Sequence, residues 1–379
     1  MEMIKPGTYI DFMAHKTKII GVSLTLAALS LASLFFPGPN YGIDFAGGTE
    51  LQLHFGGDIG AGEVRQQLET LGYRRPDVVE VQGRQNEYIV RVREVSAISD
   101  EQAAQIRTAI ESALPAGNTL TRFKLSPGGD KLTVETSATW SVDAYKSALE
   151  SAGLEVRTAN ALSPGENHPY EAHLIGVADE LVRGLDAALG ERGPHTPRSV
   201  EWVGPKAGQQ LRDAAIKALL YAIAFIMVYV AFRFDLRFAP GGIVALTHDV
   251  LITLGIYVLV QKEVNLTTVA ALLTILGYSI NDTIVVYDRI RENMSRLRDK
   301  PLSELINIST SQMLSRTIIT SGTTLLSVMA FFIWGTPVIK DISFALFCGI
   351  LIGTYSSIYI AAPITEWMDT RFFNKAARA

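Results

Sequence analysis

The stretch Leu266–Tyr287, LTTVAALLTILGYSINDTIVVY, decides the fold because it is long, apolar and interrupted by a single charged residue, Asp282. A helix that crosses a bilayer needs about 17 to 25 predominantly apolar residues. Five further runs meet this length: Ile19–Phe36, Ala214–Phe232, Phe238–Val260, Thr317–Trp334 and Ile342–Ile364. The sequence therefore predicts a polytopic α-helical membrane protein with six transmembrane helices, one at 19–36 and five within 214–364.

The composition fits a membrane protein. The 379 residues carry a formal net charge of −4, are 48% hydrophobic and 19% charged, and have a mean hydropathy of +0.21. These values argue against a disordered chain, a fibrous protein and a nucleic-acid binder with a basic surface. The single cysteine, Cys348, excludes a disulfide framework within the chain and a cysteine-rich zinc site.

Two other interpretations of the apolar runs are less well supported. Buried helices of a soluble protein need polar faces, and these runs have almost none. The first run follows Lys16 and Lys18 and contains Ala28-Leu29-Ser30, a pattern that also fits a cleaved signal peptide. The five later runs favour a retained first helix. Lys217 lies in the first turn of its run, where its side chain can extend to the interface.

The loops between the runs predict the orientation, because lysine and arginine in short loops favour the cytoplasmic side. With six spans, four segments fall on one side: 1–18, the loops after residues 232 and 287, and the tail 365–379. Their basic residues are Lys5, Lys16, Lys18, Arg233, Arg237, Arg289, Arg291, Arg296, Arg298, Lys300, Arg371, Lys375 and Arg378. We therefore expect both termini in the cytoplasm and the hydrophilic segment 37–213 on the periplasmic side.

The segment 37–213 is predicted to be an α+β domain. Strand-like alternation occurs at 50–55, 88–92, 131–135 and 173–175, and helical apolar spacing at 63–71, 102–114, 143–152 and 180–189. The second half repeats the order of the first, and one offset aligns Gly72 with Gly153 and Leu51 with Leu132. We predict two ferredoxin-like, βαββα lobes, 41–126 and 127–205, joined by the turn at 126–129. Internal duplication and coincidence in a small alphabet both remain open.

Ionisable residues at membrane depth are the candidate functional groups, since such residues are unfavourable in lipid and usually face a partner or an aqueous path. Asp249 is expected near mid-bilayer. Asp282 is expected close to the cytoplasmic end of its helix, with Ser279 and Asn281 able to hydrogen-bond it. Arg316 opens the next helix from the same side, so an ion pair with Asp282 is geometrically available.

Proton transfer is the chemistry that this set predicts. Low dielectric favours the neutral form of a carboxyl group and a nearby guanidinium favours the charged form, so a change in the distance between Arg316 and Asp282 could switch protonation. A static ion pair is the alternative for both residues. His248, beside Asp249, fits a hydrogen-bonded polar contact between helices. No second ligand stands at helical spacing from it, so no metal site is predicted, and the sequence indicates no cofactor.

An enzyme interpretation, the intramembrane aspartyl protease, also needs two aspartates in membrane helices. Tyr287-Asp288 offers its tyrosine–aspartate pair, but the glycine-x-glycine-aspartate partner motif is absent and Asp288 falls at the membrane edge. A protease would need an aspartate dyad sharing one proton, whereas Arg316 offers a basic counter-ion. We therefore predict a protein that is not an enzyme.

Four motifs in register with the predicted helices resemble the SecF family of bacterial translocon accessory subunits, and the resemblance covers nearly the whole chain. They are Tyr41–Thr49 (YGIDFAGGT), Val203–Pro205 (VGP), Gly277–Val286 (GYSINDTIVV) and Asp288–Asn293 (DRIREN). The resemblance implies half of a transporter of the RND superfamily in the bacterial inner membrane. It also implies pairing with SecD, association with the SecYEG channel and other accessory translocon subunits, and use of the proton gradient to draw unfolded secreted polypeptide outward.

The resemblance also assigns roles to residues. Asp282 matches the family's proton-pathway aspartate and Arg316 its essential arginine. The residues of the motif that joins membrane helix to outer domain are Gly42, Asp44, Gly47, Gly48 and Thr49, of which Asp44 is expected to cap or pin the turn. The cytoplasmic motif comprises Asp288, Arg289, Arg291, Glu292 and Asn293; it fits a solvated helix face or a contact with a partner or anionic lipid.

Two other functions stay open on the sequence. One is half of an RND-type exporter of lipid or small molecules, acting as a homodimer, and the other is a scaffold of the translocon that transports nothing. A scaffold predicts that Asp282 can be neutralised without effect. The outer segment, which lies between the first two predicted membrane helices and has about 170 residues, is also longer than the resemblance leads us to expect.

Overall fold

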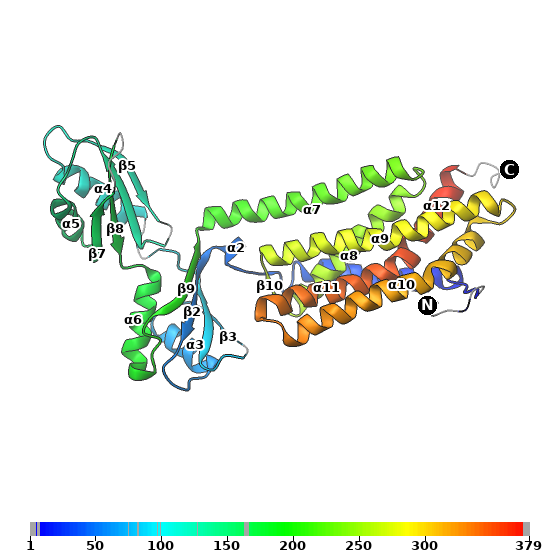
Figure 1. The fold of residues 1–379 in the computed structure, drawn as a ribbon, viewed down its shortest axis with the longest axis horizontal. Coiled ribbons are helices and arrows are strands. Elements are labelled where there is room, and N and C mark those ends of the chain that lie inside the picture. Colours follow the sequence, from blue (N-terminus) through cyan, green and yellow to red (C-terminus); the bar gives the residue numbers. More distant parts are fainter. Residues whose placement is uncertain are drawn as a thin grey trace. The chain divides into compact units, whose positions relative to one another are not determined.

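The computed structural model describes residues 5, 8–74, 76–81, 83–96, 98, 100–126, 128–162 and 167–373. The chain divides into two compact units (Figure 1): the helical unit, Met1–Gly42 with Asp213–Ala379, and the α/β unit, Ile43–Arg212. Pro127 of the predicted turn between the lobes, and Lys375 and Arg378 of the tail, lie outside the described residues.

Six helices in the described chain are long and apolar enough to cross a membrane, as predicted. They are α1 (Lys16–Ser33), α7 (Pro205–Arg233), α8 (Ala239–Leu259), α9 (Leu266–Arg296), α10 (Leu302–Trp334) and α11 (Pro337–Ser356), which continues through a π-helical turn, Ser357–Ala361, into α12 (Ala362–Met368). The helices α7, α9 and α10 are longer than the apolar runs that predicted them. For example, α9 continues past Tyr287 into a polar segment, where ion pairs such as Arg296–Glu292 at 2.8 Å stabilise the helix.

Small residues let the central helices approach closely. A Cβ added to Gly255 of α8 would lie 2.2 Å from Cβ of Ser30 on α1, and one added to Gly353 of α11 would lie 2.9 Å from Cβ of Ser279 on α9. Ser23, Ser30 and Ser33 are buried along one side of α1. Close packing through small side chains is the usual way in which helices associate in lipid. It also brings the polar side chains of α1, α8, α9 and α11 within hydrogen-bonding reach.

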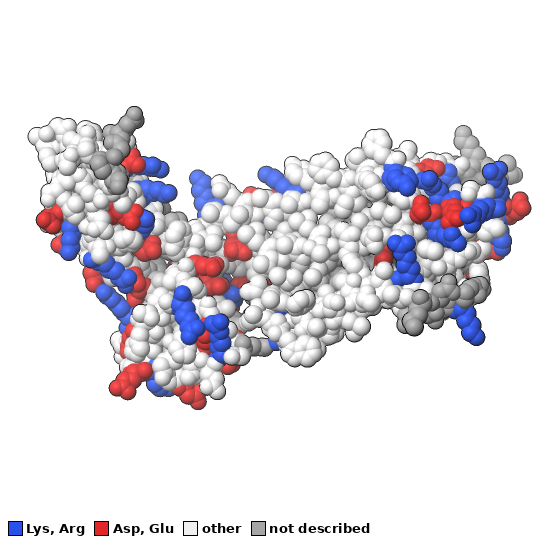
Figure 2. All heavy atoms as spheres, in the orientation of Figure 1, with Lys and Arg blue, Asp and Glu red and all other residues white. Residues whose placement is uncertain are grey.

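Charged segments of the helical unit gather at one end, where Figure 2 shows blue and red spheres together beyond a band of white. Lys16 pairs with Glu366, and Arg237 pairs with Asp369 at 2.9 Å. The segments predicted to be cytoplasmic therefore lie together. At the opposite end, β1 (Asn40–Tyr41) pairs in parallel with β10 (Glu263–Val264).

The N-terminal segment is bonded to the same charged end. The Met13 amide donates to Asn307 Oδ1 at 3.0 Å, and the Ile10 amide donates to Ser311 Oγ at 3.0 Å. Both acceptors lie on the polar extension of α10, so this extension holds the N-terminal segment against the helical unit.

The α/β unit contains two four-stranded antiparallel sheets, each covered by two helices. The first has the order β3-β4-β2-β9 and packs against α3 and α6; its elements are β2 (Gly48–His54), α3 (Ala61–Thr70), β3 (Asp77–Glu80), β4 (Glu87–Val92), α6 (Val177–Leu189) and β9 (Pro197–Val203). The second has the order β5-β6-β8-β7 and packs against α4 and α5; its elements are α4 (Asp100–Ala113), β5 (Leu120–Leu125), β6 (Lys131–Thr136), α5 (Val142–Ser151), β7 (Val156–Ala161) and β8 (His168–Leu174).

The first sheet has the βαββαβ order of ferredoxin-like folds, with its last helix and strand, α6 and β9, from the second half of the sequence. The second sheet has the permuted order αββαββ, in which α4 and β5 from the first half come before β6. The predicted lobes 41–126 and 127–205 are therefore not packing units: α4 and β5 complete the second sheet, and α6 and β9 complete the first. The reason is that either helix–strand pair presents the same apolar pattern to either sheet, so periodicity does not specify which sheet it joins.

Several equivalent positions in the two halves have the same structural roles. Leu51 and Leu132 are both fully buried, on β2 and β6. Gly72 and Gly153 end α3 and α5 with φ of +98° and +85°. The Tyr88 hydroxyl donates to the Ile59 carbonyl at 2.5 Å, and the Tyr170 hydroxyl donates to the Trp140 carbonyl at 2.7 Å.

Candidate functional site

Asp282 is buried among membrane-length helices, with 3% of its surface exposed. Ser321 on α10 donates to Asp282 Oδ2 at 3.2 Å, and the Thr354 hydroxyl of α11 lies 3.0 Å from Ser321 Oγ. One hydroxyl group, that of Ser321, therefore bonds to the carboxylate, and the Thr354 hydroxyl bonds to Ser321 in turn. Hydroxyl groups can donate or accept, so this surrounding can serve either the charged or the neutral form of the carboxyl group.

Arg316 and Asn281 do not contact Asp282 directly. Both residues are exposed. In the described part of the chain, the side chain that bonds to Asp282 is Ser321, and Arg316 forms no ion pair with it. Arg316 is still close enough to interact electrostatically with the Asp282 carboxylate. Ser279, which the sequence placed beside Asp282, bonds to Asp249 of α8 instead.

Asp249 is fully buried and has more hydrogen-bond donors than Asp282. Ser279 of α9 and Ser356 of α11 donate to Asp249 Oδ2 at 2.6 and 2.8 Å. His248 Nδ1 lies 2.9 Å from the other carboxylate oxygen, Oδ1. Asp249 therefore connects α8, α9 and α11 through its hydrogen bonds, and it makes more contacts in the site than the sequence indicated.

His248 extends this network toward α1. Its Nε2 atom lies 3.1 Å from the Tyr355 hydroxyl, which lies 3.0 Å from Ser23 Oγ. The sequence predicted a polar contact between helices for this histidine, and the structure places that contact between α8 and α11. Sequence reasoning missed Ser23, Ser321, Thr354, Tyr355 and Ser356. The available signal was the run of four hydroxyl residues at 354–357 inside an apolar helix.

The motif at 288–293 fastens α9 to α10 at the charged end. Asn293 is buried and donates to Ser309 Oγ at 2.8 Å and to Gln312 Oε1 at 3.0 Å. Arg289 Nε donates to the same Gln312 oxygen at 2.6 Å. Part of this motif is therefore a contact between helices rather than a free face.

The remaining members of that motif are more exposed. Glu292 pairs with Arg289, and Arg291 donates to the Arg233 carbonyl at the end of α7 at 3.3 Å. Asp288 is exposed on α9. These side chains are the ones that remain accessible to a partner or to lipid.

The glycine motif shapes the entry to the first sheet. Gly47 and Gly48 have φ of +77° and +142°, and a Cβ on Gly48 would lie 2.5 Å from the Val92 carbonyl oxygen. Thr49 Oγ1 donates to the Glu94 carbonyl at 2.7 Å, and Asp44 lies in the first turn of the short helix α2 (Ile43–Ala46). Within the helical unit, the Gly42 amide donates to the Val264 carbonyl at 3.0 Å.

Two family models match the chain. Residues 188–371 match the C-terminal region of the SecD/SecF protein export membrane proteins, and residues 32–58 match the SecD/SecF GG motif. A protein translocase subunit SecF from Magnetococcus marinus is 37% identical, with 100% of this chain and 97% of the relative covered. The chain belongs to the SecF family. A SecF of Koribacter versatilis is 33% identical, over 98% of this chain and 95% of its own length.

Solved structures agree with this family. The crystal structure of SecDF, a translocon-associated membrane protein from Thermus thermophilus, matches with a TM-score of 0.64 and 32% identity, over 97% of this chain and 40% of that chain. A second SecDF structure, in a super-membrane-facing form, matches with a TM-score of 0.59 and 31% identity, over 100% of this chain and 41% of that one. Their fold is therefore shared with this SecF chain.

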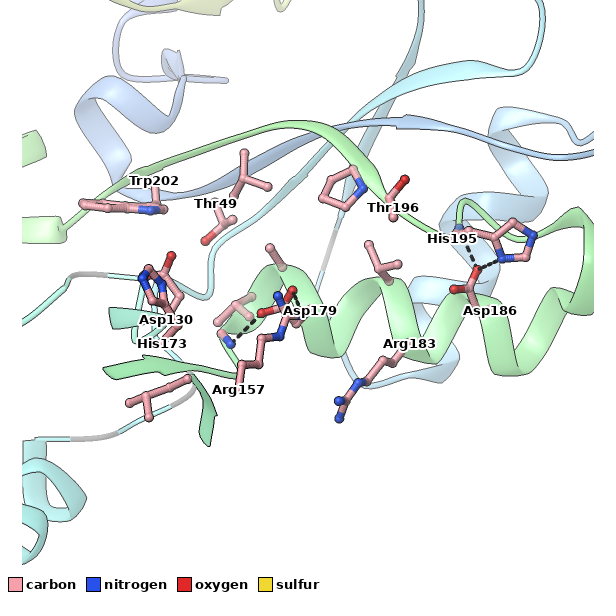
Figure 3. Close-up of a pocket in the computed structure, with 18 residues that line it drawn as sticks. Thr49, Asp130, Arg157, His173, Asp179, Arg183, Asp186, His195, Thr196 and Trp202 are labelled. Atoms are coloured by element: carbon pink, nitrogen blue, oxygen red, sulfur yellow. Dashed lines mark hydrogen bonds and ion pairs between the residues drawn. The ribbon is translucent and has the colours of Figure 1, made fainter. Parts of the chain in front are cut away.

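The α/β unit of this SecF chain also contains a cleft, shown in Figure 3, between α6, β9 and loops of the second sheet. Val200 and Trp202 of β9 line it on one side. Most of its charged groups are already paired: Arg157 with Asp179 at 2.5 Å, and Arg183 with Glu155 at 2.8 Å. The hydrogen bond from Arg183 lowers the pKa of Glu155, which favours the paired state. The cleft thus offers a mixed polar surface rather than a strongly charged one.

Proposed function

We propose that this chain pairs with SecD and uses the proton gradient to promote the late stage of polypeptide translocation through the SecYEG channel. Asp282 binds and releases the coupling proton. Arg316, which lies toward the charged end, favours the charged form of the Asp282 carboxylate. Ser279 and Asp249 extend the pathway, and Asn281 lies at its accessible edge. The function is that of a transport subunit rather than an enzyme.

A single observation carries this proposal: Asp282 is buried in the helical unit, where the Ser321 hydroxyl bonds to it and no lysine or arginine of the described residues forms an ion pair with it. A permanently charged carboxylate in that position is unfavourable in low dielectric. A static structural role would be better served by an ion pair that neutralises the charge. A group that exchanges a proton must instead be tolerated in two protonation states.

Pairing with SecD is supported by a relative named SecDF, a single chain whose name joins SecD and SecF. A SecDF of Thermus thermophilus is 33% identical over 97% of this chain, which covers 40% of the SecDF length. Apolar side chains on α1, α7 and α10 are exposed, including Leu24, Phe225 and Leu326. Lipid or a partner helix suits these surfaces, and sites of RND-like transporters lie between two such halves.

We assign the chain to the bacterial inner membrane, with both termini in the cytoplasm and the α/β unit in the periplasm. The support is the positive-inside pattern, together with the clustering of the basic segments at one end of the helical unit. The accessible arginines of the motif at 288–293 would then face anionic lipid or channel subunits. Secreted polypeptide would meet the α/β unit.

Export in membrane vesicles with an imposed proton gradient tests the function. Asp282→Asn and Arg316→Ala should abolish the gradient-dependent part of export while insertion and copurification with SecD are retained. Asp299→Asn is the matched control, because this exposed aspartate lies in the connection between α9 and α10 and undergoes the same change of charge. Unchanged export in both site variants would favour the scaffold function. A stable homodimer carrying lipid would favour the exporter function.

A further inference from the structure

A second buried group of titratable residues lies in the helical unit, on helices other than the α9–α10 pair that holds Asp282. His248 has 8% of its surface exposed, and both ring nitrogens have polar neighbours. Nδ1 lies 2.9 Å from Asp249 Oδ1, and Nε2 lies 3.1 Å from the Tyr355 hydroxyl. The Tyr355 hydroxyl lies 3.0 Å from Ser23 Oγ, so the chain of contacts crosses from α8 through α11 to α1.

The protons in this chain can be assigned from its chemistry. Asp249 Oδ2 accepts from Ser279 and Ser356, and Oδ1 faces His248 Nδ1. With Asp249 ionised, Nδ1 donates to it, and Nε2 must accept from Tyr355. The tyrosine hydroxyl then accepts from Ser23. Every polar atom in this chain of contacts then has a hydrogen-bond partner, and the group carries one net negative charge.

One additional proton would remove that net charge. Added at Nε2, it produces an imidazolium beside the Asp249 carboxylate, and the Tyr355 hydroxyl turns to accept from Nε2 and donate to Ser23. No covalent bond between heavy atoms changes. The described residues show no lysine or arginine paired with Asp249, so the proton on His248 is the charge compensation that the structure provides. A net charge at membrane depth is unfavourable, which favours uptake of this proton.

We propose that His248, Asp249 and Tyr355 form a second proton-binding site of the helical unit, separate from Asp282. The inference rests on the proposed function, because it adds a second proton-binding step to the same coupled machine. Its ligand is a proton, held by His248 Nε2 and stabilised by Asp249. Tyr355 positions the imidazole and connects the site to α1.

The titratable groups that contact the His248 ring come from its own helix and from α11. Asp249 shares α8, Tyr355 comes from α11, and α9 contributes the neutral Ser279, which bonds to Asp249. The contact from α1 is the neutral Ser23. The path from this group to Asp282 runs along α11, where Thr354 bonds to Ser321.

The segment 354–357 of α11 touches both sites. Thr354 reaches Ser321, the residue that donates to Asp282, whereas Tyr355 and Ser356 bond to His248 and Asp249. Ser357 Oγ lies 2.9 Å from Thr283 Oγ1, and the π-helical turn of α11 begins at this residue. Widened turns of this kind often occur at functional positions. Proton binding at either site would therefore change hydrogen bonds of the same short segment.

The test measures the protonation of His248 directly. The full-length chain, labelled with ¹⁵N-histidine and reconstituted in lipid bilayers, is titrated between about pH 5 and 8, the range in which histidines change charge. The spectrum distinguishes the two neutral tautomers from the imidazolium. His248→Gln assigns the signal among the six histidines. We expect the Nδ1-protonated tautomer at high pH and its conversion to the doubly protonated ring at low pH.

Variants separate a proton-binding site from a structural contact. Asp249→Asn should remove the doubly protonated form from this pH range, and Tyr355→Phe should move the midpoint of the conversion. Tyr359→Phe, one turn further along, is the matched control and should leave the midpoint unchanged. A neutral His248 with one tautomer throughout the wild-type titration would overturn the inference, and that result needs no variant beyond the assignment.

The same experiment distinguishes this inference from the proposed function. If Asp282→Asn abolishes gradient-dependent export while wild-type His248 remains neutral, the second site is wrong and the proposed function stands. If His248 titrates but Asp282→Asn leaves export unchanged, the second site stands without the proposed coupling at Asp282. A His248 midpoint that moves in Asp282→Asn would show that the two sites sense each other.

Discussion

Glu171 of β8 is an example of a carboxylate outside the predicted membrane helices whose charged form is stabilised by its neighbours. It accepts from Lys131 of β6 at 2.6 Å and lies 3.1 Å from His173 Nε2. The hydrogen bond from Lys131 lowers the pKa of Glu171 below its usual value. Asp282 differs, because it bonds to the Ser321 hydroxyl, which can donate to the charged carboxylate or accept from the neutral carboxyl group. The two environments separate a carboxylate that stabilises the fold from one suited to exchange a proton.

The lowered pKa of Glu171 makes the second sheet sensitive to acid. Because its pKa in the folded state lies below that in the unfolded state, about 4.3, the pair stabilises the fold above this pH and the contribution is lost as the pH falls through the folded pKa. For a partly exposed pair the contribution is up to about 1 kcal/mol. Glu171→Gln should therefore lower the urea midpoint at neutral pH and reduce its further fall in acid.

The measurement follows the fluorescence of Trp140, which is buried in the second sheet's core, in the full chain with the three other tryptophans replaced by phenylalanine. Glu150→Gln is the control, since its pair with Lys146 is exposed and 3.7 Å long. Equal acid sensitivity in Glu171→Gln and the parent chain would show that another group is responsible.

The exchange of helix–strand pairs between the two sheets is the main feature at the scale of elements. The helix α6 follows β8 in sequence, yet its apolar residues belong to the first sheet's core, whereas α4 packs in the second core. As a result, the chain passes between the two sheets twice, from β4 to α4 and from β8 to α6. Local damage to α6 should therefore appear in the first sheet, although α6 directly follows β8 of the second sheet in the sequence.

Leu181→Ala tests this exchange. Leu181 of α6 is fully buried, and loss of such a side chain destabilises a core by about 2–5 kcal/mol. Hydrogen exchange of the full chain should accelerate in β2 and β4 more than in β6 and β8. Ile110→Ala on α4 is the matched change and should give the opposite pattern. Faster exchange mainly in β6 and β8 after Leu181→Ala would contradict the exchanged arrangement.

The strength of sequence prediction differed between elements for physical reasons. Apolar runs are detectable because a bilayer requires them, and the six helices follow from that requirement. The central strands β2, β4 and β6 were found because their alternation reflects one buried face. The edge strands β3, β5, β7 and β9 were missed, since fewer of their residues are buried and their pattern is weak.

Partners of the buried carboxylates could not be predicted from the sequence. Asp249 and Asp282 stand out because charge is rare in these helices, but serine and threonine are common there and often bond to their own backbone. Thr323 and Ser327 of α10 do so, donating to Ile319 and Thr323 carbonyls at 2.8 and 3.1 Å. Only the packing of α10 and α11 against α9 shows which hydroxyl groups reach a carboxylate.

On the scale of the whole molecule, the chain combines a helical unit with buried carboxylates and an α/β unit with many surface ion pairs. Its membership of the SecF family agrees with this combination. The exposed apolar surfaces of α1, α7 and α10 fit a chain that works beside a second helical half. The central claim is therefore that a proton taken up at Asp282 is coupled to work on the polypeptide.

Proton movement through the reconstituted complex with SecD tests that claim most directly. Liposomes containing a pH-sensitive dye and the complex are given an inward proton gradient, and acidification is compared between wild type, Asp282→Asn and the control Asp299→Asn. The account predicts proton entry in wild type and in Asp299→Asn, and its loss in Asp282→Asn with the complex intact. Undiminished proton entry through the Asp282→Asn complex would contradict the account.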